Sequence, residues 1–199
     1  THRFSRPLAQ GDVGDLIGDF LGLDSAAQIG LEFRYGLFSG TQIGIHRTNE
    51  KTIQLFAQQD LVRQGDASPV GVNALITVEG LNNFRTERSA GIGVVISRKV
   101  GDRGAIYAEP IWVSNTNFLP ADPVDDDQTF MVGLGARIRI RPSVYVLGQI
   151  VPRVAGHAPG SPHAAFGIEK RAGGHTFQLN VSNALGTTVG QMARGGDTA

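Results

Sequence analysis

Residues 28–35 read Gln-Ile-Gly-Leu-Glu-Phe-Arg-Tyr, a stretch in which polar or small residues alternate with large apolar ones. Because successive side chains of an extended chain point to opposite sides, the apolar residues share one face, and Glu32 and Arg34 share the other. The stretch therefore predicts a β-strand with two chemically different faces.

The same alternation recurs along most of the chain from residue 26 onward. It predicts ten strands, which cover residues 28–35, 42–46, 52–58, 70–79, 91–99, 105–114, 130–141, 144–153, 164–171 and 177–182. No helical pattern between them is long enough for a crossover connection, so the sheet is expected to be antiparallel. Within residues 105–114, Pro110 predicts a bulge or a locally broken ladder.

The connections between these strands alternate between two length classes. The short ones cover residues 36–40, 63–68, 100–103, 141–143 and 171–174. The long ones cover residues 6–24, 81–88, 114–127 and 155–162 and the tail from Asn183, and only residues 48–50 break the rule. Short turns at one end and long loops at the other are typical of a transmembrane outer-membrane β-barrel, whose short turns lie in the periplasm.

Both ends of the chain fit an incomplete barrel. His2-Arg3-Phe4 looks like the tail of an outward-running strand, and the chain stops within a long-loop segment. Barrels of this class have even strand numbers, so we expect ten strands here and twelve in the complete protein. Residues 1–199 are thus predicted to form one β-barrel domain that lacks part of its first strand and its closing C-terminal strand.

The loop of residues 6–24 carries its own pattern. Its apolar residues recur at helical spacing and are Val13, Leu16, Ile17, Phe20 and Leu21. They predict a short amphipathic helix, either as a plug, lid or docking surface or as a loop helix packed on the rim.

Composition excludes several classes of protein. The 199 residues contain no Cys, so disulfides, thiolate nucleophiles and Cys-ligated metal sites are absent. The 18 basic and 18 acidic side chains balance, and no basic face for nucleic acid is evident.

Several short motifs resemble an uncharacterised family of bacterial outer-membrane β-barrel proteins, classed as a domain of unknown function. They are His2-Arg3-Phe4, Phe33-Arg34-Tyr35-Gly36-Leu37, Gln42-Ile43-Gly44-Ile45, Lys51-Thr52-Ile53, Arg63-Gln64-Gly65 and Glu109-Pro110-Ile111-Trp112-Val113. The resemblance implies a barrel in the outer membrane and brings no activity or site residues.

The sequence offers little for catalysis or metal binding. Barrel hydrolases need a Ser beside a His on the rim. His46 has no Ser two residues on, and His157, His163 and His175 lie in or beside predicted turns, so we expect no enzyme activity. Asp122 and residues 125–127 could gather a Ca²⁺ ion, but they lack the spacing of a calcium loop. We expect a solvated acidic loop, and neither a metal nor a cofactor.

The polar face is the most informative feature. Its charged members, the candidate lumen-lining residues, are Glu32, Arg34, Asp60, Glu79, Lys99, Glu109, Arg137, Arg139, Arg141, Arg153, Glu169 and Arg171. Facing inward, they would line a pore or pair into a salt-bridged plug. Facing outward, they would cover a soluble, lipocalin-like ligand binder. The aliphatic character of the opposite face along many strands favours the membrane.

These features predict a non-enzymatic protein of the bacterial outer membrane, surrounded by lipid, that acts as a narrow porin-like channel or a membrane scaffold. A docking barrel whose long loops hold a protein partner, such as a surface or electron-transfer assembly, is the alternative. In a pore, Arg137, Arg139 and Arg141 would point the same way, about 7 Å apart along one strand. We therefore expect a modest preference for anions.

Overall fold

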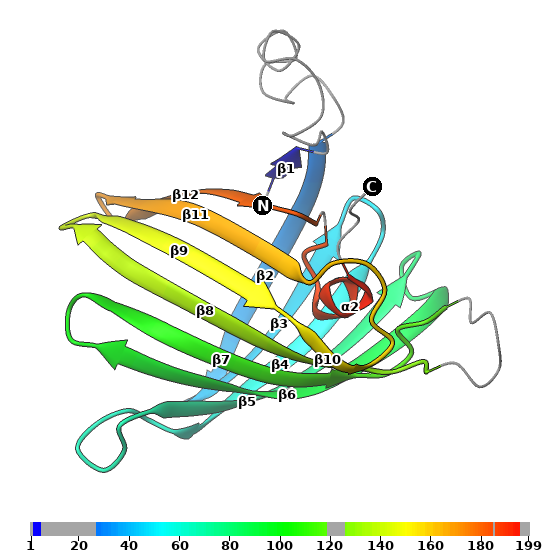
Figure 1. Ribbon diagram of the computed structural model, residues 1–199, viewed down its shortest axis with the longest axis horizontal. Coiled ribbons are helices and arrows are strands. Elements are labelled where there is room, and N and C mark those ends of the chain that lie inside the picture. The colour runs from blue at the N-terminus through cyan, green and yellow to red at the C-terminus, as the bar shows by residue number, and fades with distance from the viewer. Residues whose placement is uncertain (1, 5–26, 119–125, 185, 196–199) are drawn as a thin grey trace, which may run out of the picture.

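All but one of the strands pair antiparallel along the order of the sequence, and the result is one twelve-stranded sheet (Figure 1). The computed structural model describes residues 2–4, 27–118, 126–184 and 186–195. The strands are β1 (His2–Phe4), β2 (Ala27–Phe38), β3 (Thr41–Thr48), β4 (Ile53–Val62), β5 (Gly71–Leu81), β6 (Thr86–Val100), β7 (Gly104–Val113), β8 (Thr129–Arg141), β9 (Val144–Val151), β10 (Arg153–Gly156), β11 (His163–Ala172) and β12 (His175–Ser182).

The ten predicted strands and their antiparallel order are confirmed. The stretch expected as one strand over residues 144–153 is divided at Pro152 into β9 and β10, and β10 pairs with β8. The predicted tail of an outward strand is β1, which pairs with the start of β2. The sheet order runs from β1 to β9 and then to β11 and β12.

The two ends of this order, β1 and β12, do not pair with each other. A closing strand is not among the described residues, so the count of twelve spanning strands in the complete protein stays a prediction. The helix predicted within residues 6–24 also lies outside the described part of the chain.

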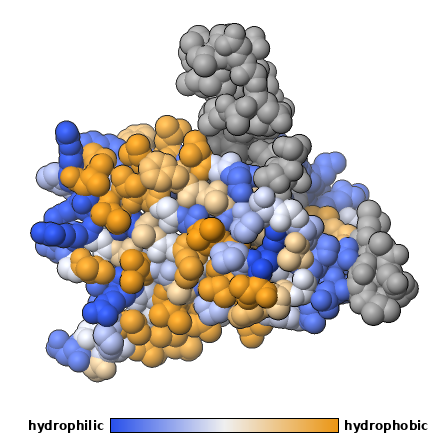
Figure 2. Space-filling model, in the orientation of Figure 1, coloured by the Kyte–Doolittle hydropathy of each residue, from blue (hydrophilic) through white to orange (hydrophobic). Residues whose placement is uncertain are grey.

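The two faces of the sheet differ in the way that the alternation predicts. On β5, Glu79 is 2% exposed, whereas Ile76 and Val78 on the other face are 55% and 44% exposed. Figure 2 shows apolar residues gathered along the strands and hydrophilic residues toward both ends. A soluble barrel would bury its aliphatic side chains, so the lipocalin-like alternative does not fit this arrangement.

The concave side of the sheet receives one short helix, α2 (Val189–Arg194), which lies at the mouth formed by the long connections (Figure 1). Within the described residues, no helix is both long and apolar enough to cross a membrane.

Pro110 interrupts the ladder between β6 and β7 without a bulge. The pairs Gly93–Ile111 and Ile96–Ala108 flank it in unchanged register, but no pairs form between them. Proline has no N–H to donate, so the interruption is local.

Gly44 on β3 leaves the space that the buried ring of Phe56 on β4 occupies. A Cβ atom at position 44 would overlap this ring and lie 2.8 Å from the backbone oxygen of Phe33. We expect Gly44→Ala to lower the free energy of unfolding by about 1–3 kcal/mol, as overpacking does elsewhere, measured by urea unfolding in detergent micelles.

Gly148→Ala is the matched control, because a Cβ atom there meets no other atom within 4 Å. Its stability should change by about 0.5 kcal/mol or less. Equal losses in the two variants would contradict this packing account.

Candidate functional site

The helix α2 begins with a local signal in the sequence. Thr188 is its N-cap and accepts a hydrogen bond on its side chain from the backbone N–H of Gln191 (3.2 Å). The side chain of Gln191 in turn accepts the backbone N–H of Thr188 (3.2 Å), which completes a capping box. This reciprocal pair fixes the first turn of a helix too short to be stable alone.

One side of α2 packs against an apolar patch of the inner wall. The helix contributes Val189, Ala193 and the partly buried Met192, and the wall contributes Phe56, Leu75, Ile111, Val113, Met131 and Val151. These wall residues come from five strands, so the helix bridges much of the mouth. The patch interrupts an otherwise polar face, and burial of its side chains against α2 favours the docked position.

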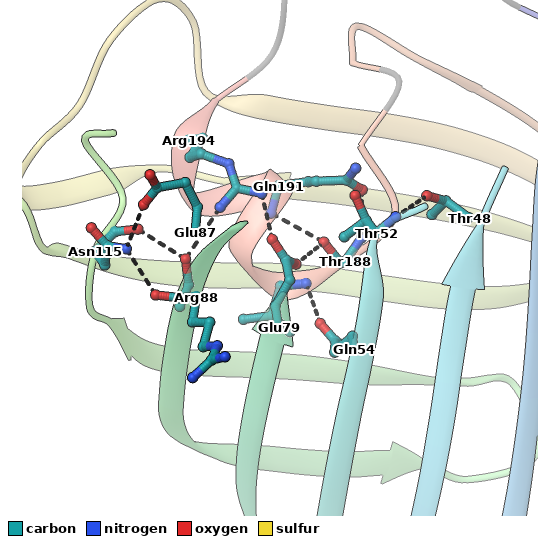
Figure 3. Close-up of polar contacts among 12 residues, drawn as sticks. Thr48, Thr52, Gln54, Glu79, Glu87, Arg88, Asn115, Thr188, Gln191 and Arg194 are labelled. Carbon is teal, nitrogen blue, oxygen red and sulfur yellow. Dashed lines mark hydrogen bonds and ion pairs between the residues drawn. The ribbon is translucent and has the colours of Figure 1, made fainter. Parts of the chain in front are cut away.

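Glu79, at the end of β5, is the polar anchor of the helix (Figure 3). Its carboxylate accepts hydrogen bonds from the Thr188 hydroxyl and from the Arg194 guanidinium, and so contacts both ends of α2. Arg194 also donates to the Ser89 hydroxyl (3.3 Å) and lies over the Phe118 ring at 4.6 Å. A carboxylate 2% exposed is stable as an anion only with such partners.

Two further contacts set how closely α2 approaches the wall. The backbone N–H of Val189, which has no partner within the helix, donates to Gln54 Oε1 on β4 (2.7 Å). A Cβ atom at Gly190 would lie 2.6 Å from Glu79 Oε1, so any larger residue there would displace the Glu79 carboxylate.

A row of polar side chains continues from the start of α2 across the neighbouring strands. His46 Nε2 lies 3.4 Å from the Thr187 hydroxyl, and His46 Nδ1 lies 3.4 Å from Glu32 Oε2. Glu32 also binds Arg34 on its own strand. The row ties the segment before α2 to β2 and β3.

A second charged cluster lies toward the short-turn end of the inner wall, on β8, β9 and β11. Glu169 accepts two hydrogen bonds from Arg137 and one from Arg171. The guanidinium of Arg137 also lies over the Tyr145 ring at 3.5 Å, and that of Arg171 at 5.2 Å. The carboxylate of Glu169 therefore has two guanidinium partners.

The other predicted lumen residues make fewer contacts. Asp60 binds Arg63 (3.3 Å), Arg153 donates to the backbone oxygens of Gly160 and Ser161 (3.0 and 2.9 Å), and Glu109 packs beside Gly133. Among the residues that the structure describes, the side chains of Lys99 and Arg139 have no hydrogen-bond or ion-pair partner.

Arg141 departs from the predicted ladder of three same-face arginines. The β8–β9 register shifts between Arg139 and Arg141, so Arg139 pairs with Tyr145 but Arg141 pairs with Val144. Val144 in turn pairs with Lys170, whereas Glu169 pairs with Tyr145, one residue away and therefore on the opposite face. The shift ends the alternation, and the inner ladder consists of Arg137 and Arg139.

The sequence interpretation treated the tail after Asn183 as loop and missed α2. Two signals were present: the capping-box spacing of Thr188 and Gln191, and the apolar Val189, Met192 and Ala193 at helical spacing. Neither signal says that the helix lies inside the sheet.

In the part of the chain that the structure describes, no group of three or more His, Asp or Glu side chains could hold a metal ion. Asp126 and Asp127 are exposed, whereas Asp122 and Asp125 lie outside the described residues.

One comparison with known proteins is informative. A family model described as "Membrane bound beta barrel domain (DUF5777)" matches residues 1–198. No curated protein and no solved structure matches the chain.

Release of α2 can be tested through Arg194, whose side chain is 17% exposed while it is bound to Glu79. Glu79→Gln removes the charge that holds Arg194, at a cost of about 2 kcal/mol. If the cleavage rate is proportional to the fraction of molecules in which α2 is released, trypsin should then cleave after Arg194 roughly 30-fold faster. The released peptide is measured by mass spectrometry.

Glu87→Gln is the matched control, because Glu87 binds Asn115 at the same rim (3.3 Å) and has no hydrogen bond or ion pair with α2. Cleavage after Arg194 at the same rate in Glu79→Gln and the unmodified protein would rule out Glu79 as the anchor.

Proposed function

The chain belongs to the membrane-bound β-barrel family, and from this premise we propose that it is a non-enzymatic, narrow channel of the bacterial outer membrane, closed at its long-loop mouth by α2. Its exposed apolar face would contact outer-membrane lipid. Its short turns would face the periplasm, as in other barrels of this architecture.

The contact between Glu79 and both ends of α2 is the observation that carries this proposal. A barrel needs no helix on its inner wall if side chains alone fill the interior. Here the chain places six helical residues at one mouth. At the other end of the wall, Lys99 and Arg139 are exposed. A polar interior blocked at one mouth suits a pore with a closed resting state.

The row of Glu32, His46 and Thr187 has the order of an acid–base–hydroxyl relay. Both of its contacts are long, at 3.4 Å, and His46 is only 5% exposed. A substrate carbonyl would need to displace the segment before α2 to reach the ring. We therefore assign this row to anchoring rather than to hydrolysis.

The test is conductance of the purified protein in planar bilayers. We expect small or rare currents from the unmodified protein, and a roughly 30-fold higher open probability in Glu79→Gln, because the same loss of about 2 kcal/mol lets the helix leave the mouth more often. Glu87→Gln should behave like the unmodified protein.

If Glu79→Gln releases α2 in the trypsin experiment but conducts no current, the channel proposal is wrong. The alternative, a docking barrel whose loops hold a protein partner, would then take its place. Large currents that are the same in all three proteins would contradict the role of α2 as the closing element.

A further inference from the structure

The inner wall near the short-turn end carries an excess of positive charge. Lys99 on β6, Arg137 and Arg139 on β8 and Arg171 on β11 face one carboxylate, that of Glu169. Asp60, which faces inward from β4, is already bound by Arg63. Among the described residues near the short turns, the four cations of β6, β8 and β11 therefore share the one carboxylate of Glu169.

Glu169 does not reach all four. It binds Arg137 and Arg171, which also lie against Tyr145, so these two guanidinium groups are held in place. Lys99 and Arg139 are exposed, and within the described ranges their side chains have no charged partner. The cluster thus combines fixed cations with two that are available to a ligand.

The pairing register brings the available cations to the same part of the wall. Arg139 is the same-face neighbour of Arg137, about 7 Å along β8. Lys99 pairs with Ala105 on β7, and Ala105 pairs with Arg137 on β8. Lys99 and Arg137 are therefore two strands apart, a spacing of about 10 Å. The small side chain of Ala105 between them leaves room, and the long side chains of Lys and Arg can converge on one group.

We propose that this part of the wall, the basic vestibule formed by Lys99, Arg137, Arg139 and Arg171, binds small soluble oxyanions with two or more negative charges. Guanidinium groups match the oxygens of phosphate and carboxylate, and several cations favour a multivalent anion over chloride. Because these side chains face inward, the ligand is a solute in the lumen rather than a lipid headgroup. The inference deepens the proposed channel function and rests on it, since it names the solutes that the pore would take.

The test is calorimetric binding of tripolyphosphate to the full chain in detergent micelles free of lipid phosphate, at low ionic strength. We expect binding that weakens as salt is added, and no binding of spermine, a polycation. Lys99→Gln and Arg139→Gln should each weaken binding roughly tenfold, and the double variant should weaken it further.

Arg98→Gln is the matched control, because Arg98 neighbours Lys99 on β6 but pairs with Ile106 on the apolar face. It should bind tripolyphosphate like the unmodified protein. The inference is overturned by no binding to the unmodified protein, by unchanged binding in the double variant with its β-sheet circular dichroism intact, or by an equal loss in Arg98→Gln.

The outcomes of this test and of the conductance test are separable. Currents through Glu79→Gln without tripolyphosphate binding would overturn the vestibule and leave the channel. Binding without currents in any variant would support the vestibule as a ligand site and overturn the channel.

Discussion

The constraint on which the structure depends is that lipid offers no hydrogen bonds to a backbone. Every N–H and C=O group in the hydrocarbon region must pair within the protein, and an antiparallel sheet with neighbouring strands in register achieves this. Once the strands pair in this way, their side chains alternate between two environments, so one face is apolar and the other takes the charges. The 55% exposure of Ile76 beside the 2% exposure of Glu79 is a direct result.

The same constraint explains where the charged side chains find partners. A carboxylate on the inner wall can be stabilised by neighbouring strands or by a segment placed inside the sheet. Glu169 uses the first solution, with Arg137 and Arg171 from the wall. Glu79 uses the second, with Arg194 and Thr188 from α2. The inner wall therefore differs between its ends: a helix covers the long-loop mouth, and exposed cations remain toward the short turns.

Local patterns predicted the strands well and the site only in part. Alternation such as that of residues 28–35 is enforced by burial in two environments, so it is visible in the sequence, and the ten strands follow from it. The position of α2 depends on contacts between Glu79 and residues more than a hundred positions away, which no local pattern encodes. The bulge that removes Arg141 from the ladder likewise depends on the β8–β9 register. Which face of an alternating strand points inward and which points outward is also a property of the whole sheet.

The central claim, that the charged face lines a water-filled interior and the aliphatic face contacts lipid, can be measured directly because the chain contains no Cys. Gln149 and Ile150 are consecutive on β9 and pair with Ala165 and Ala164, on opposite faces. A spin label attached to Cys at each position, in protein reconstituted into vesicles, reports collisions with oxygen and with a water-soluble nickel chelate. The label at 150 should collide mainly with oxygen, which concentrates in lipid, and the label at 149 mainly with the nickel chelate. The reverse pattern, or equal collision rates at the two positions, would contradict the account.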